Sequence, residues 1–318
     1  KWLTDYQYLR GINLLVLGCY PLSSRDHHMT GERPHFGPMN PLWDHLTGYH
    51  AYVARLGYTL SVGKPLIGTA LYYPARDMWA WGLAAKNAVE SYEAVAQELM
   101  TCQCPFDLID DDLLLSGTVE GKELLVGAMR YATIVCGKVK WMQPQARQRL
   151  EEFAAAGGQV LCVNHPPGCE GLPPEGSMRS IKCGPVAEVA ASAAPLITLV
   201  PPGPDVRVAG RQLKDQRLVV LLNEGSTPYR GGMGAVSANV AELDLMTGVI
   251  TRGTIENKRI ALDLAPGETK AYLFSRSQSR FARQGVEPHE RMTIDPAEIR
   301  AVAGKQNVVG EHDFEIRH

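Results

Sequence analysis

A change in hydrophobic period near residue 203 divides this sequence into two kinds of structure. Before it, continuous apolar runs alternate with segments of helical spacing. The apolar runs are 66–73, 106–109, 132–136 and 159–163, and the helical segments are 84–100 and 144–156. A strand covered on both faces shows such a continuous run, and strand–helix alternation is typical of βαβ units. The sequence therefore predicts an α/β domain with a doubly wound parallel sheet.

After residue 203 the pattern changes to short strands separated by turn residues. Strands are predicted at 217–223, 240–245, 249–253, 259–264 and 269–274. Turn-forming clusters such as Ala265-Pro266-Gly267 lie between them. Short strands at regular spacing indicate a small β-sandwich. From residue 276 onward the chain is polar and weakly periodic, and we predict a linker or the start of a further domain.

The first 63 residues predict a single strand–loop–helix unit. The apolar run Asn13 to Leu17 is predicted as a strand, and a polar loop from Gly18 to Met39 follows it. Asn40 suits the N-cap of a helix with Pro41 at its first position, and an apolar stripe continues to Leu60. One such unit needs neighbours to complete a sheet. Because the chain starts at Lys1 without an initiator Met and reaches an apolar run within a dozen residues, we interpret it as a piece of a larger protein.

Composition excludes several classes of function. The 32 Lys and Arg residues against 34 Asp and Glu residues argue against the concentrated positive charge that nucleic-acid binding needs. No apolar run approaches the ~18 residues of a membrane span. The first strand of the α/β domain leads into Tyr73-Pro74-Ala75-Arg76 instead of a glycine-rich phosphate loop, so no nucleotide cofactor is expected.

The seven cysteines are odd in number and scattered, and no pair of C-x-x-C motifs predicts a metal site. This usage favours a reducing compartment such as the cytoplasm, although the sequence does not fix the compartment. Asp110-Asp111-Asp112 is interpreted as a loop leading into a helix, with one Asp as its cap, and not as a cation site. We therefore expect no metal and no other cofactor.

Short motifs and their order resemble those of large glycoside hydrolases. These motifs are Gly11-Ile12-Asn13, Tyr20-Pro21-Leu22-Ser23, Asn40-Pro41-Leu42-Trp43, Leu71-Tyr72-Tyr73-Pro74 and Leu243-Asp244-Leu245-Met246-Thr247-Gly248. The similar families are the family 106 α-L-rhamnosidases and, more distantly, the family 42 β-galactosidases. The resemblance implies a (β/α) barrel remnant at 1–63, a flavodoxin-like, amidotransferase-like domain at 64–202, a β-sandwich at 203–275 and a linker or truncated domain at 276–318.

The implied function is hydrolysis of plant or microbial oligosaccharides by two carboxylates that flank the scissile bond. In such barrels these carboxylates usually come from earlier strands, which would precede Lys1. The loop from Gly18 to Met39 then supplies sugar contacts. The candidate residues are Tyr20, Ser23, Arg25, Asp26, His27 and Arg33. The same loop also fits a solvated surface loop, so both interpretations stay open.

The amidotransferase-like domain is expected to be non-catalytic, because Cys162 falls inside a predicted strand and the following turn reads Asn164-His165-Pro166-Pro167. Its expected partners are the missing N-terminal part of the same polypeptide or a second copy of the chain. An alternative is a non-enzymatic module for assembly or carbohydrate binding, and a degenerate amidotransferase is a third hypothesis. No nucleic acid or membrane partner is expected.

Overall fold

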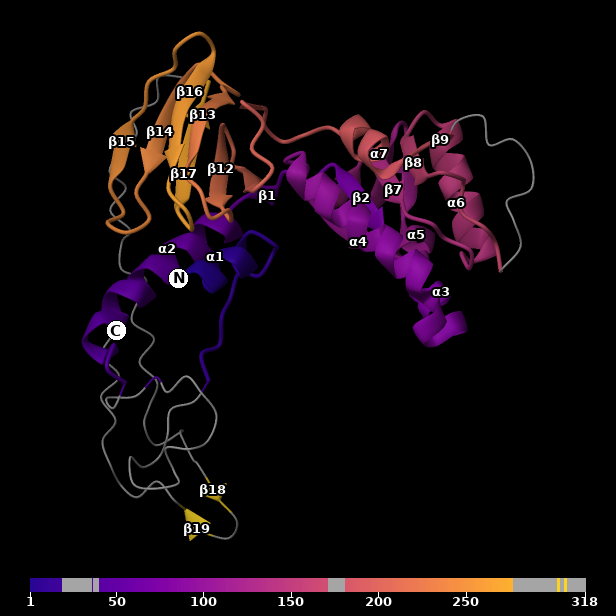
Figure 1. Cartoon of the computed structure of the whole chain (residues 1–318), viewed down its shortest axis with the longest axis horizontal. Coiled ribbons are helices and arrows are strands. Elements are labelled where there is room, and N and C mark those ends of the chain that lie inside the picture. The colour runs from indigo at the N-terminus through magenta and orange to yellow at the C-terminus, as the bar shows by residue number, and fades with distance from the viewer. Residues whose placement is uncertain (19–35, 37–39, 171–180, 277–301, 304–305, 308–318) are drawn as a thin grey trace. The chain divides into compact units, whose positions relative to one another are not determined.

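The structure is a computed structural model of the chain, and it describes residues 1–18, 36, 40–170, 181–276, 302–303 and 306–307 (Figure 1). The chain divides into two compact units, residues 1–279 and 280–318. In the second unit, β18 (Val302–Ala303) and β19 (Gln306–Asn307) pair as an antiparallel hairpin. No helix among the described residues is long and apolar enough to cross a membrane.

A five-stranded parallel sheet forms the centre of the α/β domain. Its order is β3-β2-β7-β8-β9. The strands are β2 (Thr69–Tyr72), β3 (Phe106–Ile109), β7 (Thr133–Cys136), β8 (Gln159–Val163) and β9 (Ile181–Gly184). Every residue of β2 and β7 is buried, which explains their continuous apolar runs. The predicted parallel sheet is therefore confirmed.

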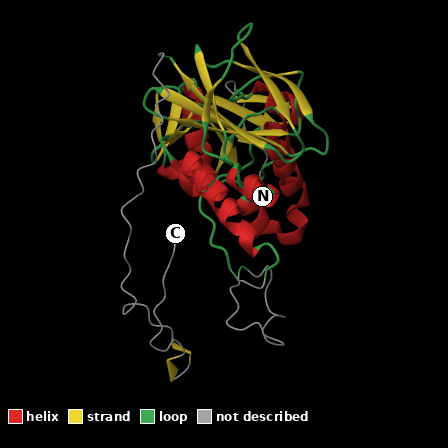
Figure 2. Cartoon of the chain, turned by 90° about the vertical axis from the view of Figure 1, so that its left-hand side faces the viewer, coloured by secondary structure: helices red, strands yellow, loops and turns green. Residues whose placement is uncertain are grey.

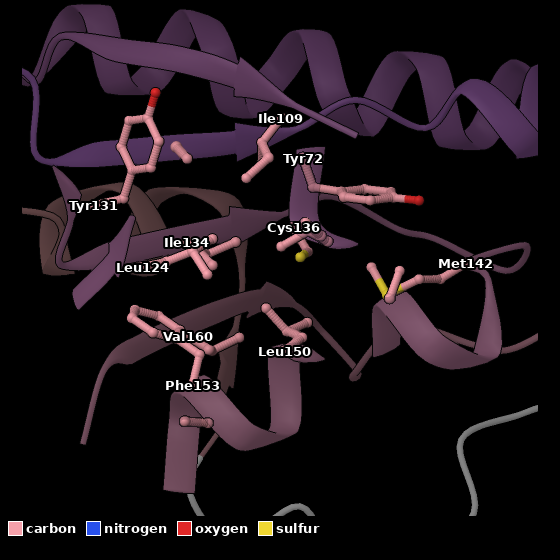
Figure 3. Packing of buried hydrophobic residues seen from close by; sticks show 14 of the residues in the cluster. Tyr72, Ile109, Leu124, Tyr131, Ile134, Cys136, Met142, Leu150, Phe153 and Val160 are labelled. Atoms are coloured by element: carbon pink, nitrogen blue, oxygen red, sulfur yellow. The ribbon is translucent and has the colours of Figure 1, made fainter. Parts of the chain in front are cut away.

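Helices cover both faces of this sheet. They are α3 (Ala75–Trp81), η3 (Gly82–Ala85), α4 (Lys86–Thr101), α5 (Asp111–Ser116), α6 (Pro144–Ala155) and α7 (Val186–Ser192). Phe153 and Leu150 of α6 pack on Ile134 and Val160 of the sheet (Figure 3). On the other face α4 and α7 share a second core with the strands. The helices predicted at 84–100 and 144–156 are confirmed to within a few residues.

Several short elements of this domain carry too few residues for a periodic signal, and the sequence did not predict them. They are α3, α7, β9 and a three-stranded antiparallel sheet of β4 (Thr118–Glu120), β5 (Glu123–Val126) and β6 (Met129–Tyr131). Leu124 of β5 and Tyr131 of β6 are buried in the core beneath α6. The small sheet therefore covers one end of that core.

Two antiparallel sheets follow in the chain and share one core. The larger has the order β1-β11-β12-β17-β14-β15, and the smaller has the order β10-β13-β16. The larger contains β1 (Lys64–Pro65), β11 (Val206–Gln212), β12 (Gln216–Asn223), β14 (Asn239–Leu243), β15 (Ile250–Arg252) and β17 (Thr269–Ser275). The smaller contains β10 (Leu199–Val200), β13 (Tyr229–Gly234) and β16 (Arg259–Leu264). Phe274 of the first sheet and Leu262 of the second lie in the same core.

The N-terminal segment packs on the larger antiparallel sheet (Figure 2). It contains α1 (Trp2–Tyr8), the short helix η2 (Trp43–His45) and α2 (Leu46–Ser61). Tyr52 and Leu56 of α2 are buried against Val220 and Ala271 of the sheet. Arg211 of β11 donates three hydrogen bonds of 2.8–2.9 Å to the carbonyls of residues 61–63 at the end of α2. This guanidinium satisfies carbonyl groups that the helix leaves without partners.

Two predictions for the N-terminal segment are wrong. Residues 13–17 do not form a strand, because they have no pairing partner among the described residues. The side chains of Leu14 and Val16 are 76% and 89% exposed. The Asn40 side chain accepts a hydrogen bond from the Leu42 N–H, as predicted for a cap, but a turn at residues 41–42 and the 3-10 helix η2 follow it, so the α-helix begins at Leu46 instead of Pro41. The helix α1 was not predicted.

Candidate functional site

Apart from residues 18 and 36, the predicted sugar-binding loop lies outside the described residues. Tyr20, Ser23, Arg25, Asp26, His27 and Arg33 all belong to it, so the structure does not test their proposed role. Among the residues that the structure does describe, no group of three or more His, Cys, Asp or Glu side chains could hold a metal ion.

The carboxyl edge of the parallel sheet holds a buried polar network. The Tyr72 hydroxyl at the end of β2 donates to Asp111 Oδ1 at 3.0 Å, and Arg76 Nε lies 2.9 Å from Asp111 Oδ2. The Gln143 N–H also donates to this carboxylate. Burial raises the pKa of Asp111, and hydrogen bonds and Arg76 oppose that effect. The neighbouring Asp110 accepts the Leu113 N–H at 3.0 Å, which confirms the predicted helix cap.

A second buried carboxylate at the same edge organises the loop after β7. Asp77 of α3 accepts the N–H groups of Lys140 and Trp141 at 3.1 and 3.2 Å. Burial raises the pKa of Asp77, and the two backbone hydrogen bonds oppose this. Asp77 does not stand out in the sequence, because the backbone groups that it accepts from lie more than 60 residues away. Both carboxylates thus hold loops of the scaffold.

The turn after β8 has the geometry of a strained corner but no nucleophile. Asn164 adopts a left-handed conformation with φ of 65°. Cys162 lies inside β8, fully buried, with Cys136 and Cys183 beside it in register on the neighbouring strands. The hydrogen bond with Cys136, together with burial, raises the pKa of the Cys162 thiol. A buried thiol of raised pKa is a poor nucleophile.

A cavity of about 390 Å³ lies where three parts of the first unit meet. The end of α1 and the residues after it, the edge strand β3, and β11 of the larger antiparallel sheet supply most of its lining. Two arginines of the lining, Arg10 and Arg207, both pair with Glu224. Arg10 Nη2 and Arg207 Nε each lie 3.0 Å from Glu224 Oε2.

The β3 side of this cavity carries one carboxylate. Asp107 accepts a hydrogen bond of 2.8 Å from the Tyr131 hydroxyl through Oδ2. Burial raises the pKa of Asp107, and this hydrogen bond opposes the effect. None of these residues stands out in the sequence. They come from distant segments, so no local pattern could join them.

Comparison with known proteins identifies a fold. No protein-family model matches this chain, and no curated protein is detectably similar in sequence. The rhamnosidase from Novosphingobium sp. PP1Y matches 89% of this chain with 30% of its own, at 17% identity and a TM-score of 0.66. The beta-galactosidase from Bacillus circulans sp. alkalophilus matches 75% of this chain with 46% of its own, at 13% identity and a TM-score of 0.53.

A third solved structure, Gan42B, is a GH42 beta-galactosidase from G. stearothermophilus. It matches 76% of this chain with 45% of its own, at 12% identity and a TM-score of 0.52. The chain therefore spans about a third to a half of the length of these structures. The predicted resemblance is confirmed as a shared fold with parts of a rhamnosidase and of beta-galactosidases.

Proposed function

We propose that this chain is part of a larger glycoside hydrolase of the α-L-rhamnosidase type that acts on plant or microbial oligosaccharides. One observation carries the proposal. A single solved rhamnosidase matches 89% of the chain, from its helices through both sheet domains. Two proteins can share one common domain by chance, but they less easily share several different domains in the same order. The shared order therefore supports a common architecture.

The α/β domain would serve as an accessory domain of the flavodoxin type. Its strands, taken in chain order, lie in the spatial order 2-1-3-4-5, which is the order of flavodoxin-type sheets. An amidotransferase would need a cysteine at the corner after β8, where Asn164 stands. We therefore propose a structural role for residues 64–202. The region from 203 to 275 would be a β-sandwich packed beside it.

The N-terminal segment, residues 1–63, would complete a barrel supplied by the rest of the protein. Large apolar side chains here are exposed, notably Trp2, Leu14 and Val16. In the proposed enzyme these side chains would pack against further protein. The loop residues Tyr20, Ser23, Arg25, Asp26, His27 and Arg33 would contact the sugar from this position.

The acid and base of the reaction would lie in the part of the enzyme that this chain does not cover. The buried carboxylates Asp5, Asp77 and Asp111 each accept two or more hydrogen bonds or ion pairs from their surroundings. A glycosidase instead needs two carboxyl groups that face a sugar across about 5–9.5 Å. These three side chains are committed to the scaffold.

A panel of aryl glycosides tests the proposal on the full gene product. We expect release of the aryl group from the α-L-rhamnoside, with less or none from the β-galactoside. Binding of these sugars without any hydrolysis would select the alternative, a carbohydrate-binding or assembly module. This alternative is favoured by the hydrogen bonds and ion pairs that hold the carboxylates of Asp5, Asp77 and Asp111 within the scaffold. Loss of both binding and hydrolysis would contradict both proposals.

A further inference from the structure

We propose that a polar pocket at one end of the two antiparallel sheets binds the phosphate group of a small phosphorylated molecule. The pocket has a volume of about 560 Å³. Its lining comes from the turn between β11 and β12, the start of β12, the end of β17 and the segment between β13 and β14. The proposal goes beyond the glycoside hydrolase function and does not rest on it.

The lining of this pocket carries an excess of positive charge. Lys214, Arg217 and Arg276 belong to it, and Asp215 is its single carboxylate. None of these four side chains forms an ion pair with another described residue, whereas Arg230 on the same pair of sheets lies 3.5 Å from a carboxylate oxygen. The two positive charges left over match a phosphate monoester, which carries about −1.5 to −2 at pH 7.

One of the three cations is held in position before a ligand arrives. Arg217 Nε donates to Gln212 Oε1 at 3.2 Å. Gln212 Nε2 in turn donates to the carbonyls of Leu213 and Gln216 at 2.7 and 3.1 Å, so both ends of this amide are fixed. The Arg217 Nη groups make no hydrogen bond to another described residue. Two N–H groups of one guanidinium can bind two oxygens of a phosphate at once.

The opposite side of the pocket offers a hydroxyl without a partner. Ser237 belongs to the lining, and its Oγ is buried and makes no hydrogen bond to any described residue. A buried hydroxyl that makes no hydrogen bond costs free energy. Rotation of this side chain toward the pocket breaks no hydrogen bond, and a phosphate oxygen would accept the proton that it offers.

The pocket is larger than a phosphate ion alone needs. Its volume lies within the range of about 300–1,000 Å³ that is typical of small-molecule sites. Val236 and Phe274 supply the apolar part of its lining, and Phe274 is buried in the core between the sheets. The space beside the cations therefore suits the organic part of a phosphate monoester.

Titration calorimetry on the 318-residue chain tests the site with inorganic phosphate and glycerol 3-phosphate as probes. We expect both to bind with a Kd of about 1 mM or lower, and acetate at the same ionic strength to bind at least about 10-fold more weakly. Arg217→Gln should weaken the binding of both probes by about 10-fold or more.

Arg230→Gln is the matched control for Arg217→Gln. Both arginines are exposed strand residues of these two sheets, so neither substitution removes a core side chain. Arg230 does not line the pocket, and it already lies beside Asp263. We expect Arg230→Gln to bind both probes with wild-type affinity.

Four results would overturn the inference. They are no binding of either probe up to about 10 mM, equal affinity for acetate and phosphate, binding of inorganic phosphate without glycerol 3-phosphate, and equal affinity of Arg217→Gln and Arg230→Gln. The assay measures binding only. Its failure is therefore distinguishable from a failure of the full gene product to hydrolyse glycosides.

Discussion

The Tyr52 hydroxyl is a sensitive point for the stability of the N-terminal segment. It donates a buried hydrogen bond of 2.7 Å to Asp5 Oδ1, and Thr269 of β17 donates to Asp5 Oδ2 at the same distance. Asp5 is fully buried, and Lys1 pairs with it as well. One carboxylate thus joins α1, α2 and the larger antiparallel sheet. We predict that Tyr52→Phe loosens this junction while leaving the aromatic packing in place.

The expected loss follows from the kind of hydrogen bond that is removed. A hydrogen bond to a charged group contributes about 1.5–3 kcal/mol to folding. Asp5 keeps its contacts with Thr269 and Lys1, so we expect the lower part of this range, about 1.5–2 kcal/mol. Each 1.4 kcal/mol changes an equilibrium constant about tenfold. The opening that exposes the α2 amides should therefore become about 10- to 30-fold more frequent.

Hydrogen exchange of peptides from α2 measures this opening directly. Tyr58→Phe is the matched control in the same helix, because the Tyr58 side chain is 62% exposed. We expect faster exchange of the α2 amides in Tyr52→Phe and wild-type exchange in Tyr58→Phe. Exchange within about twofold of wild type in Tyr52→Phe, or an equal effect of both substitutions, would refute the reasoning.

Three further predictions concern caps and buried charge. Asp110→Ala should cost about 1 kcal/mol in unfolding free energy through loss of the α5 cap, whereas Asp112→Ala, at an exposed position, should cost much less. Arg211→Lys should speed hydrogen exchange at the end of α2, because an ammonium cannot reproduce its three bonds, whereas Arg230→Lys at an exposed position should not. Burial raises the pKa of Asp107 above its unfolded value near 3.8, so its contribution to stability is present below that pH and is lost as pH rises through the folded pKa. Urea unfolding should therefore show Asp107→Asn gaining stability relative to wild type between about pH 4 and pH 7, and a constant difference would contradict this.

The sequence predicted the elements whose signal is local. The strand 159–163 has the predicted bounds, because all but its first residue are buried between helices and its apolar run is continuous. The cap at Asp110 was also predictable from a local signal, since a cap and its helix are adjacent in the chain. Strand β13 was missed because Tyr229–Gly234 contains three glycines, which are rare in strands. Its pairing with β10 and β16 overrides that local preference.

The candidate sites depended on contacts that no local pattern encodes. Asp77 acts on the backbone of residues 140–141, and the cavity joins Arg10, Asp107 and Arg207 from segments about a hundred residues apart. The run Asn13 to Leu17 shows the opposite case. Its apolar pattern is typical of a strand, but a strand also needs a partner, and the described residues supply none. A local pattern alone therefore does not decide the structure there.

Hydrolysis of an aryl α-L-rhamnoside by the full gene product and by the 318-residue chain, measured side by side at equal concentration, tests the central claim most directly. We predict turnover by the full gene product and none by the chain, because the acid and base would lie in the part that the chain lacks. Turnover by the isolated chain would contradict this account, and so would a full gene product that hydrolyses no glycoside.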